Sequence, residues 1–273
     1  MRVQTEEWQR FIPGVRMYKG KKTLFYNGEI LSKEIPLQYY GQGIEFLIYD
    51  EEERQSWEAI IVLPGVEVIA YLTFVDCIKV EAVIMADSSV RRIEESAFQD
   101  CYKLAYVKLS RNLEYIGRVA FFSTSLISVF IPPSCTRIDS QAFNSCDELI
   151  IFHVPQDTEL YGWDVFHGTN LLGISPVEMN NEREVEDMDN EVSDWIKNIN
   201  NDEQYALHRA CSSFDPSEDY IYGIVQRERS LAIFKQKNSI GITPSQYLSA
   251  NPYAEVTEQM IIKRFVLEIM GEL

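Results

Sequence analysis

The stretch that decides the fold is Ala97-Phe98-Gln99-Asp100-Cys101, in which alanine and phenylalanine are followed, three positions after the phenylalanine, by a cysteine. The phenylalanine position recurs along the chain at steps of 24, 23, 22 and 23 residues. Such regular spacing predicts a repeat architecture. The five phenylalanines are Phe74, Phe98, Phe121, Phe143 and Phe166, and three of the copies end in Cys77, Cys101 and Cys146.

Each copy is followed by a segment of alternating apolar residues, which predicts a β-strand because side chains on a strand alternate between its two faces. These segments are 80–85, 104–109, 126–131, 149–154 and 171–175, with a further copy at 57–62. One unit of about two dozen residues cannot bury its own apolar face, so stacking of units is required. We therefore expect a parallel β-solenoid with a shared spine of phenylalanines.

This pattern resembles the BspA-type leucine-rich repeat. The resemblance rests on apolar strand positions closed by proline, an apolar pair such as Leu113 and Ile116, and the Ala-Phe-x-x-Cys motif, and it covers roughly 57–177. It implies a curved β-sheet solenoid that binds proteins or surfaces and carries no catalytic residues of its own. Since relatives are often cell-surface proteins, a surface or adhesion role is the alternative function. The first residues show no apolar signal segment.

Composition excludes several classes of function. The 273 residues carry a formal net charge of −17, which opposes the cationic footprint that nucleic-acid binding needs. No apolar run approaches the roughly 18 residues of a membrane helix, so no membrane insertion is expected. Five cysteines without a CxxC motif predict free thiols and a cytoplasmic location. We expect Cys77, Cys101 and Cys146 to be small buried residues, with a Cys77–Cys101 disulfide as the alternative.

The fold class expected is α+β, with the solenoid followed by helices. Residues 1–56 do not repeat and are interpreted as an N-terminal β cap, because the first coil of a solenoid exposes an edge. The solenoid is assigned to 57–177. Residues 178–194 hold eight carboxylates and one arginine, which is typical of an acidic linker. The remainder, 195–273, has helical periodicity.

Part of the helical region resembles ankyrin repeats. Ala206-Leu207-His208-Arg209-Ala210 is similar to the P-L-H-x-A motif, and Gly241-Ile242-Thr243-Pro244 is similar to the start of a further repeat. The resemblance covers about 204–250, and another small helical domain is the alternative. The last helix, capped near Asn251-Pro252 or near Thr257 and running to Gly271, has a broad apolar arc that predicts a buried helix.

The sequence contains no catalytic motif. The three histidines have no ligand spacing on one helix face, and the patterns of nucleophile elbows, zinc peptidases and dinucleotide sites do not occur. We therefore expect no enzymatic activity, no metal and no cofactor. The remaining enzymatic alternative is a hydrolase with two carboxylates in a solenoid groove.

The expected function is protein–protein interaction through the sheet face of the solenoid. In each strand segment the first, fourth and sixth positions point inward, so the third and fifth form an outer face that is unusually apolar. Aromatic residues flanked by aliphatic ones are typical of binding hot spots. The alternative is that the terminal segments cover this face within the chain. The negative charge favours a basic partner protein. The predicted binding residues are Tyr106, Lys108, Phe130, Ile151 and His153.

Overall fold

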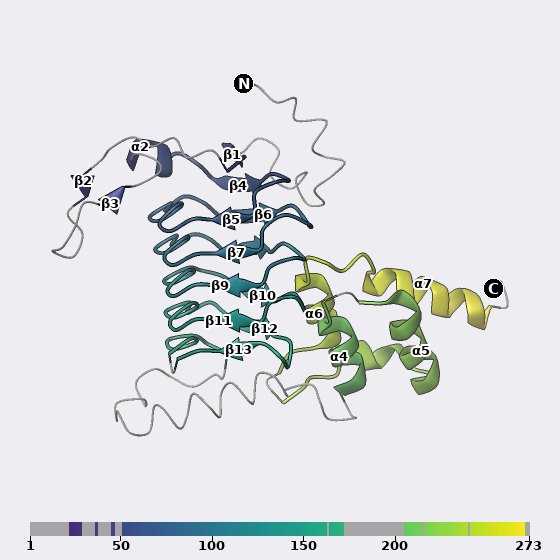
Figure 1. The fold of residues 1–273 in the computed structure, drawn as a ribbon. Coiled ribbons are helices and arrows are strands. Elements are labelled where there is room, and N and C mark those ends of the chain that lie inside the picture. Colours follow the sequence, from purple (N-terminus) through teal and green to yellow (C-terminus); the bar gives the residue numbers. More distant parts are fainter. Residues whose placement is uncertain are drawn as a thin grey trace, which may run out of the picture.

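The computed structural model describes residues 22–28, 36–37, 45–46, 51–162, 164–171, 205–214, 216–239 and 241–270. The acidic segment 178–194 and most of the predicted strand 171–175 lie outside the described residues. Within the described parts the structure is a β-solenoid with a group of helices beside it (Figure 1).

The larger sheet of the solenoid has six parallel strands, in the chain order β1-β4-β6-β8-β10-β12. The register keeps equivalent repeat positions side by side, since Ala59 pairs with Ala82 and Ala82 pairs with Tyr106. This arrangement confirms the predicted solenoid. The strands are β1 (Thr23–Tyr26), β4 (Ala59–Val62), β6 (Ala82–Met85), β8 (Tyr106–Lys108), β10 (Ser128–Phe130) and β12 (Ile151–His153).

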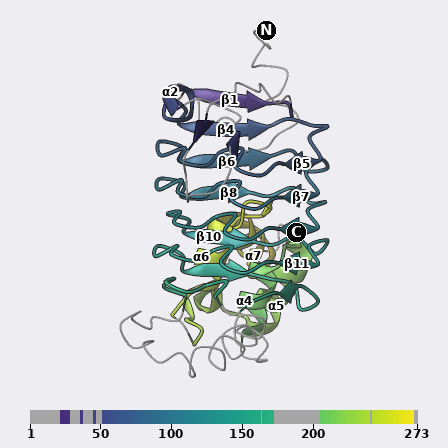
Figure 2. The same cartoon turned by 60° about the vertical axis from the view of Figure 1, so that its left-hand side comes forward.

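A second parallel sheet runs along another side of the solenoid, with two-residue strands in the order β5-β7-β9-β11-β13. Figure 2 shows the two stacks of strands at different sides of the coil. The second residue of the apolar pair that follows a main strand lies in one of these short strands and is buried, as Ile93 and Ile116 show. The strands are β5 (Val68–Ile69), β7 (Arg92–Ile93), β9 (Tyr115–Ile116), β11 (Arg137–Ile138) and β13 (Glu159–Leu160).

The repeated phenylalanines form a continuous column through the core. Ring centroids of successive residues lie 5.2 Å apart for Phe74 and Phe98, 5.2 Å for Phe98 and Phe121, and 5.3 Å for Phe121 and Phe143. Phe166 continues the column at 6.1 Å from Phe143. The inward strand residues pack around these rings in one cluster. Stacked rings therefore connect each coil to the next, as the repeat pattern requires.

Two positions per coil, two residues before and two after the phenylalanine, adopt the left-handed backbone conformation that makes the tight turns; in the last coil only the second position does so. They are occupied by Leu72, Ser96, Val119 and Gln141 at the first position and by Asp76, Asp100, Ser123, Ser145 and Gly168 at the second. Only one of these nine residues is glycine, so the stacking of the coils must offset the cost of positive φ at the others.

The N-terminal part contributes one strand and one short helix to the solenoid. Strand β1 pairs in parallel with β4 and so continues the main sheet. Helix α2 (Glu51–Arg54) carries Arg54, whose Nη1 donates to the Val75 carbonyl at 2.9 Å. Strands β2 (Pro36–Leu37) and β3 (Glu45–Phe46) pair with each other in an antiparallel arrangement.

The C-terminal helical module consists of four α-helices and one short 3-10 helix among the described residues. α4 packs against α6, and α5 packs against α7. Thr243 caps α6 in a capping box, and Pro244 is its first residue. The ankyrin likeness stays a prediction. The elements are α4 (Ala206–Ser212), α5 (Glu218–Glu228), η4 (Leu231–Lys235), α6 (Pro244–Ala250) and α7 (Glu258–Ile269).

The prediction that the last helix is buried is wrong. Within α7 only Ile261 is buried, whereas Val266 and Ile269 are exposed. The helix packs on α5 along one side and has no described element over its other apolar positions (Figure 1). The broad apolar arc of α7 is thus only partly covered by other elements within the described parts of the chain.

Candidate functional site

The five residues predicted to bind a partner all belong to the outer side of the main sheet. Lys108, Phe130 and His153 form one column across β8, β10 and β12, since Phe130 pairs with His153 and Lys108 occupies the equivalent position. Tyr106 and Ile151 belong to the neighbouring column. The predicted inward and outward positions are confirmed by the clusters in which the side chains lie.

This part of the sheet is covered by the helical module. Phe130 is 1% exposed and Ile151 is 4% exposed, and both belong to a cluster with Leu207, Leu248 and other apolar helix residues. The Ser128 hydroxyl also donates to the Ala250 carbonyl at 3.5 Å. The prediction that Phe130 and Ile151 form an open binding face is therefore wrong. Their apolar character stabilises docking of the chain's own helices, the alternative expected above.

Lys108 is also buried, in a charged cluster of the solenoid that faces Tyr253 of the helical module. Its Nζ lies 2.8 Å from Asp87 Oδ1, and Arg111 Nε lies 3.8 Å from Asp87 Oδ2. Both cations face the ring of Tyr253, at 5.7 Å for Lys108 and 5.3 Å for Arg111. Lys108 is therefore enclosed between its solenoid partner Asp87 and the Tyr253 ring, and it is not exposed to a partner protein.

Tyr253 provides a buried contact of the helical module with the solenoid. Its ring lies against Phe214, with 3.9 Å between centroids, and its hydroxyl donates to the Leu109 carbonyl at 2.7 Å. Burial raises the pKa of Tyr253 well above its ordinary value, so the hydroxyl stays protonated and can donate. A buried donor and acceptor that satisfy each other fix the position of the module on the sheet.

Tyr106 on β8 and His153 on β12 are half-buried. The His153 ring lies 6.2 Å from that of Phe130, and burial lowers the pKa of His153 to about 4. The imidazole is thus neutral at pH 7 and offers no cation to an acidic partner. Tyr106 packs on Ile61 and Ile84, which are each 1% exposed.

The outer side of the second sheet carries exposed polar residues that already pair with one another. Arg92 lies 4.1 Å from the Tyr115 ring centroid and 2.8 Å from Glu94. The Tyr115 hydroxyl donates to Asp139 at 2.5 Å. Desolvation, followed by this hydrogen bond, raises the pKa of Tyr115 to about 12. These pairs connect successive coils and give this side a structural role.

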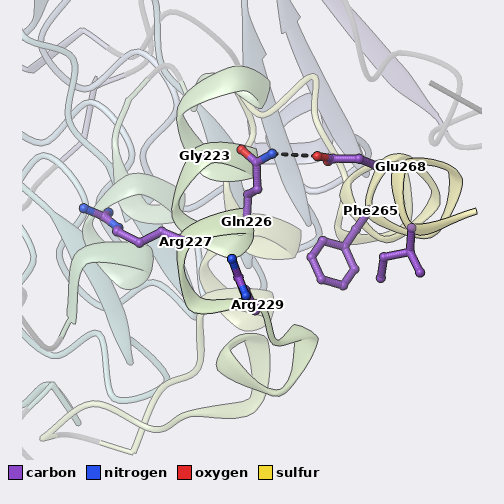
Figure 3. Close-up of a pocket in the computed structure, with 7 residues that line it drawn as sticks. Gly223, Gln226, Arg227, Arg229, Phe265 and Glu268 are labelled. Carbon is purple, nitrogen blue, oxygen red and sulfur yellow. Dashed lines mark hydrogen bonds between the residues drawn. The ribbon is translucent and has the colours of Figure 1, made fainter. Parts of the chain in front are cut away.

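A groove that the sequence analysis did not predict lies between α5 and α7 (Figure 3). It has a volume of about 690 Å³. Gln226 on α5 spans the gap between the helices, and its Nε2 donates to Glu268 Oε1 at 2.7 Å. The apolar wall is formed by Phe265 and Ile269 of α7. One signal was present in the sequence, namely Gly223 in the middle of a helical segment, which lowers helix stability without an evident reason.

Apolar side chains of α7 continue from this groove onto the surface. Ile269 is 71% exposed, Met270 is 64% exposed and Val266 is 42% exposed. Single exposed apolar residues are common, but neighbouring ones on a helix beside a groove are typical of interaction sites. This combination makes the α5–α7 face the candidate functional site.

The described residues offer no support for metal chemistry or a membrane span. No group of three or more His, Cys, Asp or Glu in the described parts of the chain could hold a metal ion. Within those same parts, every helix is too short or too polar to traverse a bilayer. The five cysteines are buried and free, and the Cys101 and Cys146 thiols donate to the carbonyls of Phe74 and Phe121 at 3.1 Å.

Comparison with protein families identifies the type of the repeat. Residues 67–184 match the BspA type leucine rich repeat region in six copies. The repeat region of this chain is therefore a BspA-type leucine-rich repeat region, as its sequence motif predicted. A solenoid of this class is typically a non-enzymatic interaction scaffold. The match supports a repeat protein involved in protein interaction or in a surface function.

Solved structures of leucine-rich repeat proteins resemble the solenoid. A protein from T. pallidum is 28% identical with a TM-score of 0.38, and the match covers 40% of this chain and 54% of that one. A protein from Bacteroides ovatus is 25% identical with a TM-score of 0.40, and the match covers 55% of this chain and 38% of that one. The chain thus spans about half or less of these relatives. No curated protein matches this chain.

Proposed function

We propose that the protein is a non-catalytic interaction module in which the solenoid is a rigid platform and the helical module carries the partner-binding surface. Stacked coils with a continuous aromatic core favour rigidity, because every coil packs on its neighbours. The Tyr253–Leu109 hydrogen bond and the contacts of Lys108 and Arg111 with the Tyr253 ring hold the helical module in a defined place on this platform. A partner therefore meets a preorganised surface, which reduces the entropic cost of binding.

The observation that carries this proposal is the exposed apolar side of α7. Around Phe130 and Ile151 the outer side of the main sheet is occupied by the chain's own helices, and charges of the second sheet pair with one another. In contrast, Val266, Ile269 and Met270 are exposed beside a groove. Burying them against a partner would remove apolar surface from water, which is the main favourable term in protein association.

The proposed partner is a protein, and the proposed location is the cytoplasm. Free cysteines are typical of proteins that stay in a reducing compartment, and all five thiols of this chain are free. Their burial in the core leaves them no role in disulfide exchange with a partner.

A photo-cross-linking residue placed at Ile269 tests the binding surface. Native extract is irradiated with this chain and with a matched chain that carries the cross-linker at Ile127, an exposed isoleucine on the solenoid. We expect a discrete protein cross-link from position 269, lost when Val266→Ser is added, and none from position 127. Cross-links only from position 127, or cross-links from 269 that are insensitive to Val266→Ser, would refute the proposed surface.

A further inference from the structure

Gly223 forms an open place in the wall of the α5–α7 groove. It lies in the middle of α5, where glycine destabilises a helix relative to alanine. A Cβ atom at this position would meet no heavy atom of the described chain within 4 Å. No described neighbour therefore requires the glycine, and the missing side chain leaves space that an external group can fill.

The two helices that border the groove are held together at both ends of α5. Arg264 of α7 binds the first turn of α5, at 2.7 Å from Asp219 and 3.4 Å from Glu218. At the other end Gln226 binds Glu268 (Figure 3). The groove is thus a preformed feature with an apolar wall, Phe265 and Ile269, facing the space beside Gly223.

The rim of the groove is cationic. Arg227 and Arg229 line it and make no ion pair with any residue in the described parts of the chain. Figure 3 shows Arg229 below Gln226, with Phe265 to the right of both, whereas Arg227 extends to the left, away from Phe265. Glu268 is the one acidic group of the lining, and its carboxylate already accepts from Gln226. Segment 227–237 carries four cationic residues and one acidic residue, in a chain whose net charge is −17.

We propose that this groove binds an acidic amphipathic peptide segment of a partner protein. An apolar side chain of the segment enters beside Gly223 and packs on Phe265 and Ile269, while a carboxylate of the segment pairs with Arg229. This inference rests on the proposed function, namely that the helical module carries the binding surface. Binding of an amphipathic segment between two helices is a common mode of peptide recognition.

Local charge, and not the net charge of the chain, determines whether this groove prefers an acidic or a basic peptide. Salt screens charges beyond about 8 Å at physiological ionic strength, so carboxylates elsewhere in the chain act weakly here. The net charge led to the expectation of a basic partner, whereas the arginines at the rim favour an acidic one. Guanidinium groups also bind carboxylates in two-point geometry, which adds specificity.

Fluorescence anisotropy with labelled synthetic peptides tests this proposal on the full chain. The acidic probe has about twelve residues, roughly three helical turns, with two leucines four positions apart among glutamates. One comparison peptide has lysines in place of the glutamates, and another has serines in place of the leucines. We expect the acidic leucine peptide to bind, and we expect the affinity of both comparison peptides to be lower by a factor of about ten or more.

Two variants assign the binding to this groove. Gly223→Leu fills the open place and should abolish binding of the acidic peptide, with an unchanged or higher melting temperature showing that the fold is intact. Arg229→Glu should reverse the preference between the acidic and the lysine peptide. Lys103→Glu makes the same charge reversal at an exposed position of the solenoid and should leave binding unchanged.

Three results would overturn the proposal. Absence of binding by the acidic peptide, or binding that survives both Gly223→Leu and Arg229→Glu, rejects the groove as its site. Preferential binding of the lysine peptide that is lost in Gly223→Leu rejects the acidic chemistry but leaves the proposed surface standing. Binding of the acidic peptide only after the carboxylates of 178–194 are replaced by amides identifies the chain's own segment, not a partner, as the occupant.

Discussion

The Tyr253 hydroxyl, just after α6, donates a hydrogen bond to the backbone carbonyl of Leu109 at the end of β8, 144 positions earlier in the chain. Both residues are buried, at 3% and 1% exposure. This bond joins the helical module to the solenoid in a region where water cannot replace a lost partner. The interface is consequently part of the fold, and the sheet beneath it is closed to other proteins.

Tyr253→Phe tests the energetic importance of this bond. The variant leaves the buried Leu109 carbonyl without its donor, so we expect a loss of about 1–3 kcal/mol in the free energy of unfolding. Urea denaturation of both chains measures the difference. Tyr220→Phe is the control, because Tyr220 is exposed, and it should change stability by less than about 0.5 kcal/mol. Equal stability of Tyr253→Phe and the unmodified chain would mean that the bond does not form.

Phe130→Ala is expected to destabilise the chain. Although Phe130 is on the outer side of the sheet, it lies in a closed apolar cluster, so its truncation removes buried surface and leaves a cavity. We expect a loss of about 3–5 kcal/mol, comparable with that of Phe121→Ala in the central column. Thermal unfolding monitored by circular dichroism measures both variants. An unchanged melting temperature for Phe130→Ala would show that this face is open.

Glycine-to-alanine substitution should have opposite effects at two positions. A Cβ at Gly117 would lie 2.6 Å from the Glu95 backbone nitrogen in the preceding coil, so Gly117→Ala forces the coils apart and should cost about 1–3 kcal/mol. Gly223→Ala meets no described neighbour and should stabilise helix α5 by about 0.5–1 kcal/mol. Denaturation curves of the two variants provide the comparison, and a shift in the same direction would contradict this account of coil spacing.

His153 should make stability depend on pH. Burial lowers its pKa to about 4, whereas the unfolded value is about 6.5. Between these values the unfolded chain binds more protons, so stability falls as the pH drops from about 6.5 towards 4. His153→Gln should reduce this slope, by up to about 1.4 kcal/mol per pH unit. Urea denaturation at several pH values measures the slopes, and identical slopes would contradict burial of the imidazole.

The repeat made the solenoid predictable from the sequence. The regular spacing of the phenylalanines predicted that they occupy equivalent positions in successive coils, as Phe74, Phe98, Phe121 and Phe143 do. The alternation of apolar residues around Val107 predicted which side chains of the strand face inward and which face outward. Such information is local, since every coil packs on its neighbours in the chain. The solenoid was therefore predictable, and so was the presence of helices after it in the chain.

The use of the sheet face could not be predicted in the same way. An apolar outer residue such as Phe130 or Ile151 is suited equally to a partner and to a covering module of the same chain. The contact that decides between them, from Tyr253 to Leu109, joins positions with no shared sequence pattern. The α5–α7 groove was missed for a related reason, because the broad apolar arc of α7 is also typical of a buried helix.

Amine labelling of lysines in the intact chain tests the central claim most directly, namely that the helical module covers the main sheet at β8, β10 and β12. Lys108 is 3% exposed beneath the module, whereas Lys103, five positions earlier, is exposed on the solenoid. After brief treatment with an amine-reactive reagent, mass spectrometry should find Lys103 modified and Lys108 protected. Equal modification of the two lysines in the native chain would show that the sheet is open and would contradict this account.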